Sequence, residues 1–453
     1  METLGGVSVV VAGAGLAGLA AARDLVLGGA HVAVVDARAR VGGRVWTVRD
    51  AFAGGQHAEA GGDLIDEDQR EIRLLAAELG LTFTRILHSG WGYVRPDGSG
   101  RTRIVRPAAS RGWERIADAL EALIHPYHLA EHSWDSPIAI DLARRSVARW
   151  LDEIKADSEL HSTATGLRGF FLADPHELSL LALVDQFASS NDRPASWKMY
   201  RIEGGNDRLA TALASTLGDR LKLRTEVVAV SHRGRSVRVS VKSGRTVSQM
   251  TCDYMVFALP APLLRRIPIS PALPVQQHDA IARLRYGRAT KTLLQFSRRF
   301  WRAPGRPRAF GSAQAFGALW EGNEEQRGRL GILSLLAGGG ASDATQSLVA
   351  THGMPALVAS LDWLGGKETQ LVRSHQTVWE ADPWARGGYA FFDPSYDAGF
   401  RSWLARPFGR LFFAGEHTSV RWQGYMNGAI ESGRRAAAEV AATHRLAGCA
   451  KAS

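Results

Sequence analysis

The hydrophobic pattern at the start of the chain predicts a strand, a helix and a second strand in close succession. Residues 7–12 form an unbroken apolar run, which is typical of a strand buried on both faces of a parallel sheet. An alanine-rich segment with high helical propensity follows a short glycine turn. Residues 31–35 form a second strand-like run that ends on Asp36. This order predicts a βαβ unit with parallel strands.

The glycine turn has the spacing GxGxxG, within the run Gly13-Ala14-Gly15-Leu16-Ala17-Gly18. Gly13 permits a tight turn, Gly15 lets the backbone approach a pyrophosphate, and Gly18 lets helix and strand pack closely. The helix N-terminus offers free N–H groups and positive dipole to phosphates. Asp36, about 20 residues beyond the glycines, is placed to accept a hydrogen bond from a ribose hydroxyl. Because strands, helix and acid agree, we predict a dinucleotide site rather than a glycine turn without a ligand.

Changes in periodicity predict the elements of the remaining chain. Residues 68–80 read as an amphipathic helix with a glycine stop, residues 91–105 as a hairpin, and residues 113–190 as mainly helical. The block 281–378 mixes strands with glycine loops such as 338–340, which is typical of an antiparallel sheet in a second domain. The other predicted elements are a hairpin turn at 96–100, a helix capped by Asn206 or Asp207, strands at 221–224, 226–231, 236–242, 254–258, 291–296 and 330–336, an apolar strand within 411–416, and a helix over 424–444.

The length of 453 residues exceeds what one hydrophobic core usually organises, so we expect two interleaved domains. We predict an α/β fold in which a Rossmann-type nucleotide-binding domain alternates with a substrate domain made of a mixed sheet and a helical insert. The expected boundaries are 1–85, 203–280 and 379–453 for the first domain, and 86–202 and 281–378 for the second.

Charge and composition exclude several classes of function. The net charge of +10 first suggests nucleic acid, but the arginines are scattered and no basic run is interleaved with aromatic residues, so we expect no nucleic-acid partner. Cys252 and Cys449 are the only cysteines and lie far apart, which argues against a disulfide framework; no His/Cys spacing is typical of a metal site. No apolar stretch approaches the length of a membrane span, so we expect a cytoplasmic protein without a membrane partner.

Two more glycine pairs offer places where backbone can approach a ligand. Gly42 and Gly43 precede Arg44, whose guanidinium can fork onto a phosphate. Gly61 and Gly62 follow a short apolar segment in the same part of the chain.

The most specific motif lies near the C-terminus, in LFFAGEHTSVRWQGYMNGAIESGRRAA. Phe-Ala-Gly-Glu and Gly-Tyr-Met-x-Gly-Ala occur there in order, and the run 40–44 is followed by Val45-Trp46-Thr47. Together with the N-terminal glycine motif, these segments resemble the flavin-dependent amine oxidase family, and monoamine oxidases in particular. The resemblance covers most of the chain in pieces, but not the helical insert at 110–195.

The resemblance implies that FAD lies extended across the opening βαβ unit. Asp36 stands where the family more often has glutamate, and Gly388 stands where animal monoamine oxidases carry the cysteine linked to the flavin, so noncovalent FAD is expected. The implied cofactor contacts are Gly13, Ala14, Gly15, Gly18 and Arg44 at the pyrophosphate, Asp36 at the adenosine ribose, Val227 at the adenine, Gly61, Gly62, Trp379 and Tyr425 beside the flavin ring, Glu416 at ribityl or pyrophosphate oxygens, and Met426 at the flavin pyrimidine carbonyl through its backbone N–H.

Three residues match the family's reaction site. Lys291, followed downstream by Phe300-Trp301, resembles the lysine that holds a water next to flavin N5; the alternative is a solvated charge at a strand edge. Tyr389 and Tyr425 match the two tyrosines that form an aromatic sandwich around the amine; the alternative is an amphipathic core residue in each case.

The sequence thus predicts an FAD-dependent amine oxidase that passes a hydride from the amine α-carbon to flavin N5. The imine would hydrolyse to an aldehyde or ketone, and O2 would be reduced to H2O2. A hydrophobic or aromatic amine is favoured over an L-amino acid or a polyamine, although Asp174, Glu177 and Asp185 lie in the helical insert. The alternatives are a flavin-dependent desaturase, a non-redox flavin isomerase and a silent FAD-binding subunit. A homodimer is compatible with the sequence but is not determined by it.

Overall fold

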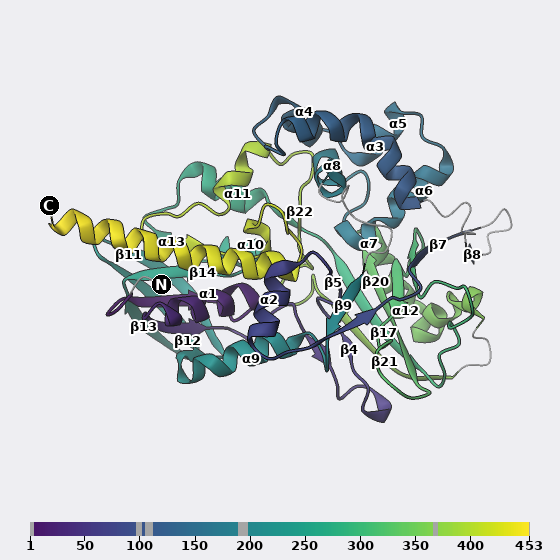
Figure 1. The fold of residues 1–453 in the computed structure, drawn as a ribbon, viewed down its shortest axis with the longest axis horizontal. Coiled ribbons are helices and arrows are strands. Elements are labelled where there is room, and N and C mark those ends of the chain that lie inside the picture. Colours follow the sequence, from purple (N-terminus) through teal and green to yellow (C-terminus); the bar gives the residue numbers. More distant parts are fainter. Residues whose placement is uncertain (1–3, 97–101, 105–111, 189–197, 366–369, 453) are drawn as a thin grey trace.

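In the computed structural model, two sheet regions lie side by side and a layer of short helices covers one of them (Figure 1). The structure describes residues 4–96, 102–104, 112–188, 198–365 and 370–452. The residues expected to turn the 91–105 hairpin, and both ends of the 110–195 insert, lie partly outside these ranges.

A five-stranded parallel sheet forms the first region, in the order β10-β2-β1-β14-β23. The predicted opening unit is confirmed as β1 (Ser8–Ala12), α1 (Leu16–Leu27) and β2 (His31–Val35). The other three strands come from distant parts of the chain: β10 (Leu221–Lys222), β14 (Tyr254–Phe257) and β23 (Leu411–Phe413). The inner strands β1 and β14 and the strand β23 are almost entirely apolar and buried because helices or loops cover both faces of the sheet.

Three helices cover one face of this sheet. They are α1, α9 (Asp207–Leu217) and α13 (Met426–Ala452), which runs along the sheet in Figure 1. A Cβ added at Gly433 would lie 2.2 Å from the carbonyl oxygen of Ala17, so glycine allows α13 to touch α1 backbone to backbone. The short helix α2 (Arg70–Glu78) packs at the end of this layer, within the predicted 68–80 segment.

Two smaller sheets add to this architecture. The first has the order β13-β12-β11-β15, and the second has the order β5-β9-β6. The strands are β11 (Thr225–Arg233), β12 (Ser236–Ser243), β13 (Thr246–Cys252), β15 (Ile269–Ser270), β5 (Ile65–Asp66), β6 (Phe83–Ile86) and β9 (Met199–Ile202). The helices α10 (Ala261–Leu264) and α11 (Val275–Arg283) follow β14 in the proline-rich connection.

A seven-stranded sheet forms the second region, in the order β21-β17-β20-β19-β18-β7-β8. Its neighbours are antiparallel except for the parallel pair β7–β18, so the expected antiparallel sheet is a mixed one. The strands are β7 (Trp91–Pro96), β8 (Thr102–Ile104), β17 (Ala289–Phe296), β18 (Ala309–Ser312), β19 (Ala318–Glu321), β20 (Gly331–Gly338) and β21 (Leu371–Val378).

The glycine run 338–340 is not a loop, as the sequence suggested, but the start of a helix. Gly339 has a φ of +56° and precedes α12 (Gly340–Ala359), which packs on β17 and β20. Glycine adopts this left-handed conformation without strain, so the run turns the chain sharply from strand into helix.

The predicted helical insert is confirmed as a layer of six helices within the described residues. They are α3 (Gly112–Leu129), α4 (Pro137–Ala143), α5 (Val147–Glu153), α6 (Ser158–Gly166), α7 (Arg168–Phe171) and α8 (Leu180–Ala188), at the top of Figure 1. The apolar helix α8 packs against α3 and α4, and α7 reaches down to β20. The insert therefore forms a helical layer next to the seven-stranded sheet.

Candidate active site

A cavity of about 1140 Å³ runs from the N-terminus of α1 to the helical layer. Its lining includes segments from both sheets, from the helical insert and from the start of α13. Of the residues predicted to bind the cofactor, all line it except Ala14 and Gly18, and Lys291, Tyr389 and Tyr425 line it too. The tertiary structure thus brings the separate predicted motifs to one continuous space.

The glycine turn at one end of the cavity leaves room for a phosphate. Gly13 has a φ of +105°, and a Cβ there would lie 2.6 Å from the carbonyl oxygen of Ala258. A Cβ at Gly18 would lie 1.8 Å from the carbonyl oxygen of Gly13, so α1 packs directly on the turn. Gly15 differs, because a Cβ there would meet nothing within 4 Å and would project into the cavity that Gly15 lines. This open space at a helix N-terminus fits a pyrophosphate.

Asp36 organises the same turn through its carboxylate. Oδ2 accepts a hydrogen bond from Ala14 N at 2.7 Å, and Oδ1 accepts one from Arg38 N at 2.8 Å. Burial raises the pKa of Asp36, and these two N–H groups oppose the shift. Each carboxylate oxygen has more than one acceptor site, so the side chain can hold the loop and still accept from a ribose hydroxyl. Val227 of β11 lines the cavity near this carboxylate.

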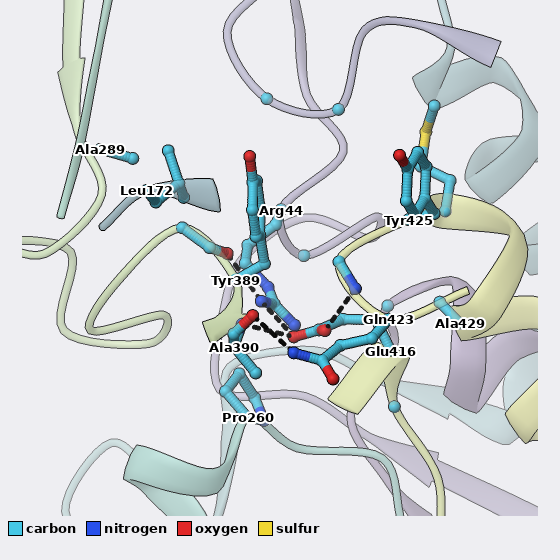
Figure 2. A pocket seen from close by; sticks show the side chains of 18 of the residues that line it. Arg44, Leu172, Pro260, Ala289, Tyr389, Ala390, Glu416, Gln423, Tyr425 and Ala429 are labelled. Carbon is cyan, nitrogen blue, oxygen red and sulfur yellow. Dashed lines mark hydrogen bonds and ion pairs between the residues drawn. The ribbon is translucent and has the colours of Figure 1, made fainter. Parts of the chain in front are cut away.

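A half-buried Arg44 and a buried Glu416 form an ion pair in the middle of the cavity wall (Figure 2). Arg44 Nη1 lies 3.0 Å from Glu416 Oε1 and donates to the carbonyl oxygen of Gly388 at 2.7 Å. Glu416 Oε2 accepts from Gly424 N at 2.9 Å. Burial alone would raise the pKa of Glu416, but Arg44 outweighs it and the pKa lies below its usual value. Arginine and carboxylate at this place offer a charged donor and acceptors for polar oxygens of a cofactor.

Gly61 and Gly62 lie where no larger residue fits. A Cβ at Gly61 would lie 1.9 Å from the carbonyl oxygen of Arg44, and one at Gly62 would lie 2.9 Å from Sδ of Met426. Trp379 Nε1 donates to the carbonyl oxygen of Ala60 at 3.0 Å, which fixes the indole beside this segment. Close packing behind the segment leaves its backbone as the cavity surface.

Asn206 holds the glycine segment from behind instead of capping α9 with its side chain. It directly precedes α9, as predicted, but makes no side-chain capping bond. Its amide donates to the carbonyl oxygens of Gly62 at 3.1 Å and Asp63 at 2.8 Å. Of the two predicted caps, Asn206 thus takes the N-cap position without capping through its side chain, because its Oδ1 accepts from Ile202 N at 3.0 Å instead.

The two predicted tyrosines stand apart in the cavity with their hydroxyls on the same side (Figure 2). The Tyr389 hydroxyl donates to the carbonyl oxygen of Phe170 at 2.5 Å, which ties this ring to the helical insert. Tyr425 packs edge-on against Trp422, with ring centroids 5.7 Å apart. Burial, together with the nearby Tyr425, raises the pKa of Tyr389, so this phenol stays neutral across the physiological range.

The space beside Gly388 cannot hold a cysteine side chain. A Cβ there would lie 2.3 Å from Cδ1 of Leu172 and 2.9 Å from Cβ of Ala289, both of which Figure 2 shows next to Tyr389. Cys252 is a free, buried cysteine at the end of β13 and does not line the cavity. The described residues thus offer no thiol at the cavity.

Lys291 lies at the far end of the cavity, in the completely buried strand β17. Its ammonium donates to the carbonyl oxygen of Gly61 at 3.1 Å and to Asp63 Oδ2 at 2.8 Å. Burial lowers the pKa of Lys291, and Asp63 opposes that shift. The alternative of a solvated edge charge is thereby excluded, because β17 is an inner strand and the lysine side chain is 2% exposed.

Asp63 is the centre of a charge cluster that the sequence did not reveal. Arg201 Nε donates to its Oδ1 at 2.5 Å, and Trp320 Nε1 donates to its Oδ2 at 2.8 Å. Glu325 accepts from Arg201 on the other side at 2.9 Å. The only local signal was the position of Asp63 directly after two glycines, and nothing in the sequence linked it with Arg201 or Trp320.

Aromatic side chains form the cavity walls next to the helical insert. Trp91 lies between Phe170 and Trp320, with ring centroids 5.3 and 6.3 Å away. Of the acids in the insert, Asp185 lines the cavity and accepts from the Tyr127 hydroxyl at 2.7 Å. Asp174 and Glu177 instead pair with arginines outside the lining, at 3.1 Å from Arg168 and 3.2 Å from Arg288 respectively.

Among the described residues, no cluster of three or more His, Cys, Asp or Glu side chains is arranged to hold a metal ion. No helix in this part of the chain is both long and apolar enough to cross a membrane.

Comparison with known proteins agrees with this geometry. Residues 16–441 match the family model of flavin-containing amine oxidoreductases. A Mycobacterium tuberculosis protein assigned as a flavin-containing monoamine oxidase, AofH, is 30% identical over 96% of this chain and 97% of its own length. Flavin-containing amine oxidase A of Bos taurus is 25% identical over 95% of this chain and 84% of its own.

Two solved structures share the fold over nearly the whole length. Putrescine oxidase bound to putrescine superimposes with a TM-score of 0.83 and 25% identity, covering 96% of this chain and 99% of that one. Cyclohexylamine oxidase from Brevibacterium oxydans has a TM-score of 0.83 and 27% identity, covering 97% and 99%. The cofactor is FAD, and the absence of a thiol beside Gly388 is consistent with noncovalent binding. The chain therefore belongs to the flavin-containing amine oxidoreductase family and is an FAD-dependent amine oxidase.

Proposed function

We propose that the amine is oxidised between Tyr389 and Tyr425, with Lys291 on the opposite side of the reacting space. The observation that carries this proposal is that both rings and the lysine line one cavity, although they come from different parts of the chain. Bound FAD supplies the hydride acceptor for the α-hydrogen of the amine. The two phenol rings orient the amine, and their electron-rich faces attract its cationic form before it loses a proton.

The cofactor contacts proposed for this chain follow the cavity from end to end. Gly15 and the N-terminus of α1 would receive the pyrophosphate, Asp36 the ribose, and Val227 the adenine. Arg44 and Glu416 would meet polar oxygens in the middle. The remaining proposed contacts are Gly13, Ala14 and Gly18, which shape the turn, and Gly61, Gly62, Trp379, Tyr425 and Met426, which would flank the flavin ring.

We further propose that O2 takes the electrons and is released as H2O2, with Lys291 near the site of this step. The domain division at 1–85, 203–280 and 379–453, with 86–202 and 281–378 as the substrate domain, is proposed on the arrangement of the sheets. A cytoplasmic location is supported by the presence of only two cysteines in 453 residues. A homodimer is a further proposal that sedimentation velocity would test.

An anaerobic screen of amines tests the reaction most directly. A substrate should bleach the oxidised flavin spectrum in the absence of oxygen, and air should restore it with release of H2O2. Lys291→Met should slow the return of the oxidised spectrum at least tenfold and change bleaching less. If amines leave the flavin oxidised while an L-amino acid, a polyene or a sugar nucleotide reduces it, the proposed substrate class is wrong.

Among amines, we propose a primary amine with a hydrophobic or aromatic substituent. The aromatic walls formed by Trp91, Phe170 and Trp320 support this choice, because such rings exclude water and pack against apolar groups. Benzylamine and cyclohexylamine should therefore give a higher kcat/KM than ethylamine.

A second candidate substrate is a diamine, and one observation favours it. Asp185 is a half-buried acidic residue that lines the same cavity, and a carboxylate in such a place can pair with a second ammonium group. Diamines of three to six carbons should then be oxidised faster than the monoamines of equal length. Asp185→Asn should raise the KM for diamines at least tenfold and leave the KM for benzylamine almost unchanged. An equal effect on both KM values would contradict the diamine assignment.

A further inference from the structure

The cluster around Lys291 contains more charge than a lone active-site lysine requires. Lys291 and Asp63 have side chains that are 2% and 4% exposed, and the Arg201 side chain is 2% exposed. Burying such charges is costly unless each is paired and hydrogen-bonded. Because the chain meets this cost next to the cavity, the cluster is a candidate for a functional role.

Asp63 can receive several donors at once because a carboxylate has two oxygens and about four acceptor sites. Oδ2 accepts from Lys291 and Trp320, and Oδ1 accepts from Arg201. Its backbone carbonyl accepts from Asn206, so the loop that presents the carboxylate is also fixed. The carboxylate therefore has a defined position and direction relative to the lysine.

The ammonium of Lys291 has three donors, and two of them have partners at the base of the cavity. These partners are the carbonyl oxygen of Gly61 and Asp63 Oδ2, and the ammonium also lies 4.8 Å from the centre of the Trp320 ring. Lys291 lines the cavity, so a third N–H is left for a group within it. Removing Asp63 would free the side chain to turn and would leave a buried cation without its carboxylate.

We propose that Asp63 is a positioning residue of the oxidase reaction: it holds Lys291 as an ammonium, aimed into the cavity beside Gly61, for the step in which O2 is reduced. A fixed positive charge stabilises the negative charge that develops as O2 accepts electrons. Overall, O2 takes two electrons and two protons and leaves as H2O2. This inference rests on the proposed role of Lys291. It adds that Asp63 sets the pH range in which Lys291 is charged.

The direction of the pH effect follows from the charges that face the lysine. Asp63 and Glu59 favour the charged form of Lys291, whereas Arg201 and burial disfavour it. Burial raises the pKa of Glu59 to about 8, so this carboxyl is mainly protonated at neutral pH and supplies little negative charge. Asp63 is therefore the main carboxylate that keeps the lysine charged. Without it, the pKa of Lys291 falls further, by about 1–3 units for the loss of one adjacent opposite charge.

The test is flavin reoxidation by O2 followed by stopped flow from pH 6 to pH 9.5. The wild-type rate constant should stay nearly constant through the neutral range. In Asp63→Asn it should fall at least tenfold with rising pH, with a midpoint lower than that of the wild type, and acid should restore it. Asp63→Glu, which retains the carboxylate, should keep the wild-type pH profile. Flavin reduction by the amine under anaerobic conditions should change less than reoxidation in both variants.

A second measurement does not depend on turnover. The visible spectrum of the oxidised holoenzyme should change with pH in Asp63→Asn, at the same midpoint as the kinetics, because loss of a charge near the flavin shifts its absorption. Adding Lys291→Met to Asp63→Asn should abolish this spectral transition.

Glu325→Gln is the matched control. It removes one carboxylate from the same cluster, but Glu325 contacts Arg201 and has no hydrogen bond with Lys291. The pH midpoint of its reoxidation rate should lie within half a pH unit of the wild-type midpoint.

The possible outcomes separate the two proposals. A wild-type rate that already falls with a midpoint near pH 7, or an Asp63→Asn profile identical to the wild type, would overturn the role of Asp63. In either case amine oxidation itself stands if amines still bleach the flavin. Failure of every amine to do so would overturn the proposed function instead. If Asp63→Asn does not fold, the wild-type pH profile decides the question: a rate that stays constant through the neutral range supports the role of Asp63, and a midpoint near pH 7 overturns it.

Discussion

The two ends of the cavity are built on different principles. The end at α1 is a backbone cradle: Gly13, Gly15 and Gly18 shape it within six residues of chain. The end at Lys291 is a network of buried polar and charged side chains from a loop and from strands that are far apart in the sequence. The first end depends on residues that have no side chain, and the second depends on which side chains are hydrogen-bonded to each other. Substitutions at the two ends therefore have different consequences.

Bulk at the backbone end should have the largest effect. Gly18→Val would put side-chain atoms where a Cβ alone already lies 1.8 Å from the carbonyl oxygen of Gly13. Separating α1 from the turn should lower the free energy of unfolding by about 3 kcal/mol or more, and the purified protein should lack FAD. Thermal unfolding and the flavin absorbance of the purified protein measure both effects.

Gly15→Ala is the control for that substitution. Gly15 has an ordinary φ of −75°, and its added Cβ would meet only the open cavity. The FAD-free protein should keep its stability within about 1 kcal/mol, while FAD affinity should fall at least tenfold. Wild-type affinity in this variant would show that the pyrophosphate does not lie at this turn.

The charged end should respond to pH where the backbone end does not. Glu59 is buried, and its pKa is about 8 in the folded protein against about 4.5 in the unfolded chain. The folded state thus retains a proton that the unfolded chain releases, so this group destabilises the fold progressively as pH rises from 4.5 to 8. Glu59→Gln should therefore stabilise the protein by about 2–4 kcal/mol at pH 8 and have little effect at pH 4.5.

Urea unfolding at the two pH values measures this difference. The amide keeps one oxygen, and an oxygen at the place of Oε1 can accept from Asn206 N at 2.9 Å and from the Thr47 hydroxyl at 3.1 Å. Equal effects of Glu59→Gln at both pH values would mean that Glu59 is ionised in the folded protein.

Truncating a tyrosine should affect the reaction more than the fold. Tyr425→Ala removes one of the two rings in the cavity, and anaerobic reduction by the amine should slow about 10–100-fold because the substrate loses its orientation. Tyr425→Phe keeps the ring and should lose only a few-fold. If the alanine variant matched the wild type, the proposed sandwich would be wrong.

Removing a single hydroxyl should have the smallest effect. Tyr389→Phe loses the hydrogen bond to the carbonyl oxygen of Phe170, which links the reaction site to the helical insert. We expect a loss of about 1 kcal/mol in stability and a reduction rate within a few-fold of the wild type. Chemical denaturation and stopped flow measure the two quantities, and a larger loss of rate than of stability would assign the hydroxyl a direct role.

The sequence predicted the backbone end well because its signals are local. The run from residue 7 to Asp36 contains strand, glycine turn, helix and acid, and each is recognised by its neighbours in the chain. It did not foresee that Asp36 also binds Ala14 N and Arg38 N, or that the amide of Asn206 supports the glycine segment instead of capping a helix.

By itself, the sequence determined the βαβ unit, because glycine spacing and apolar periodicity depend on residues that are near in the chain. The tyrosine and lysine candidates came from the resemblance of the sequence motifs to a known family. Only the tertiary structure decided that Asp63, Arg201 and Trp320 meet at Lys291, and that Leu172 and Ala289 fill the space beside Gly388. The hydrogen bonds of Asp63 join residues more than 100 positions apart, and no local pattern records them because strand pairing and packing set the distances.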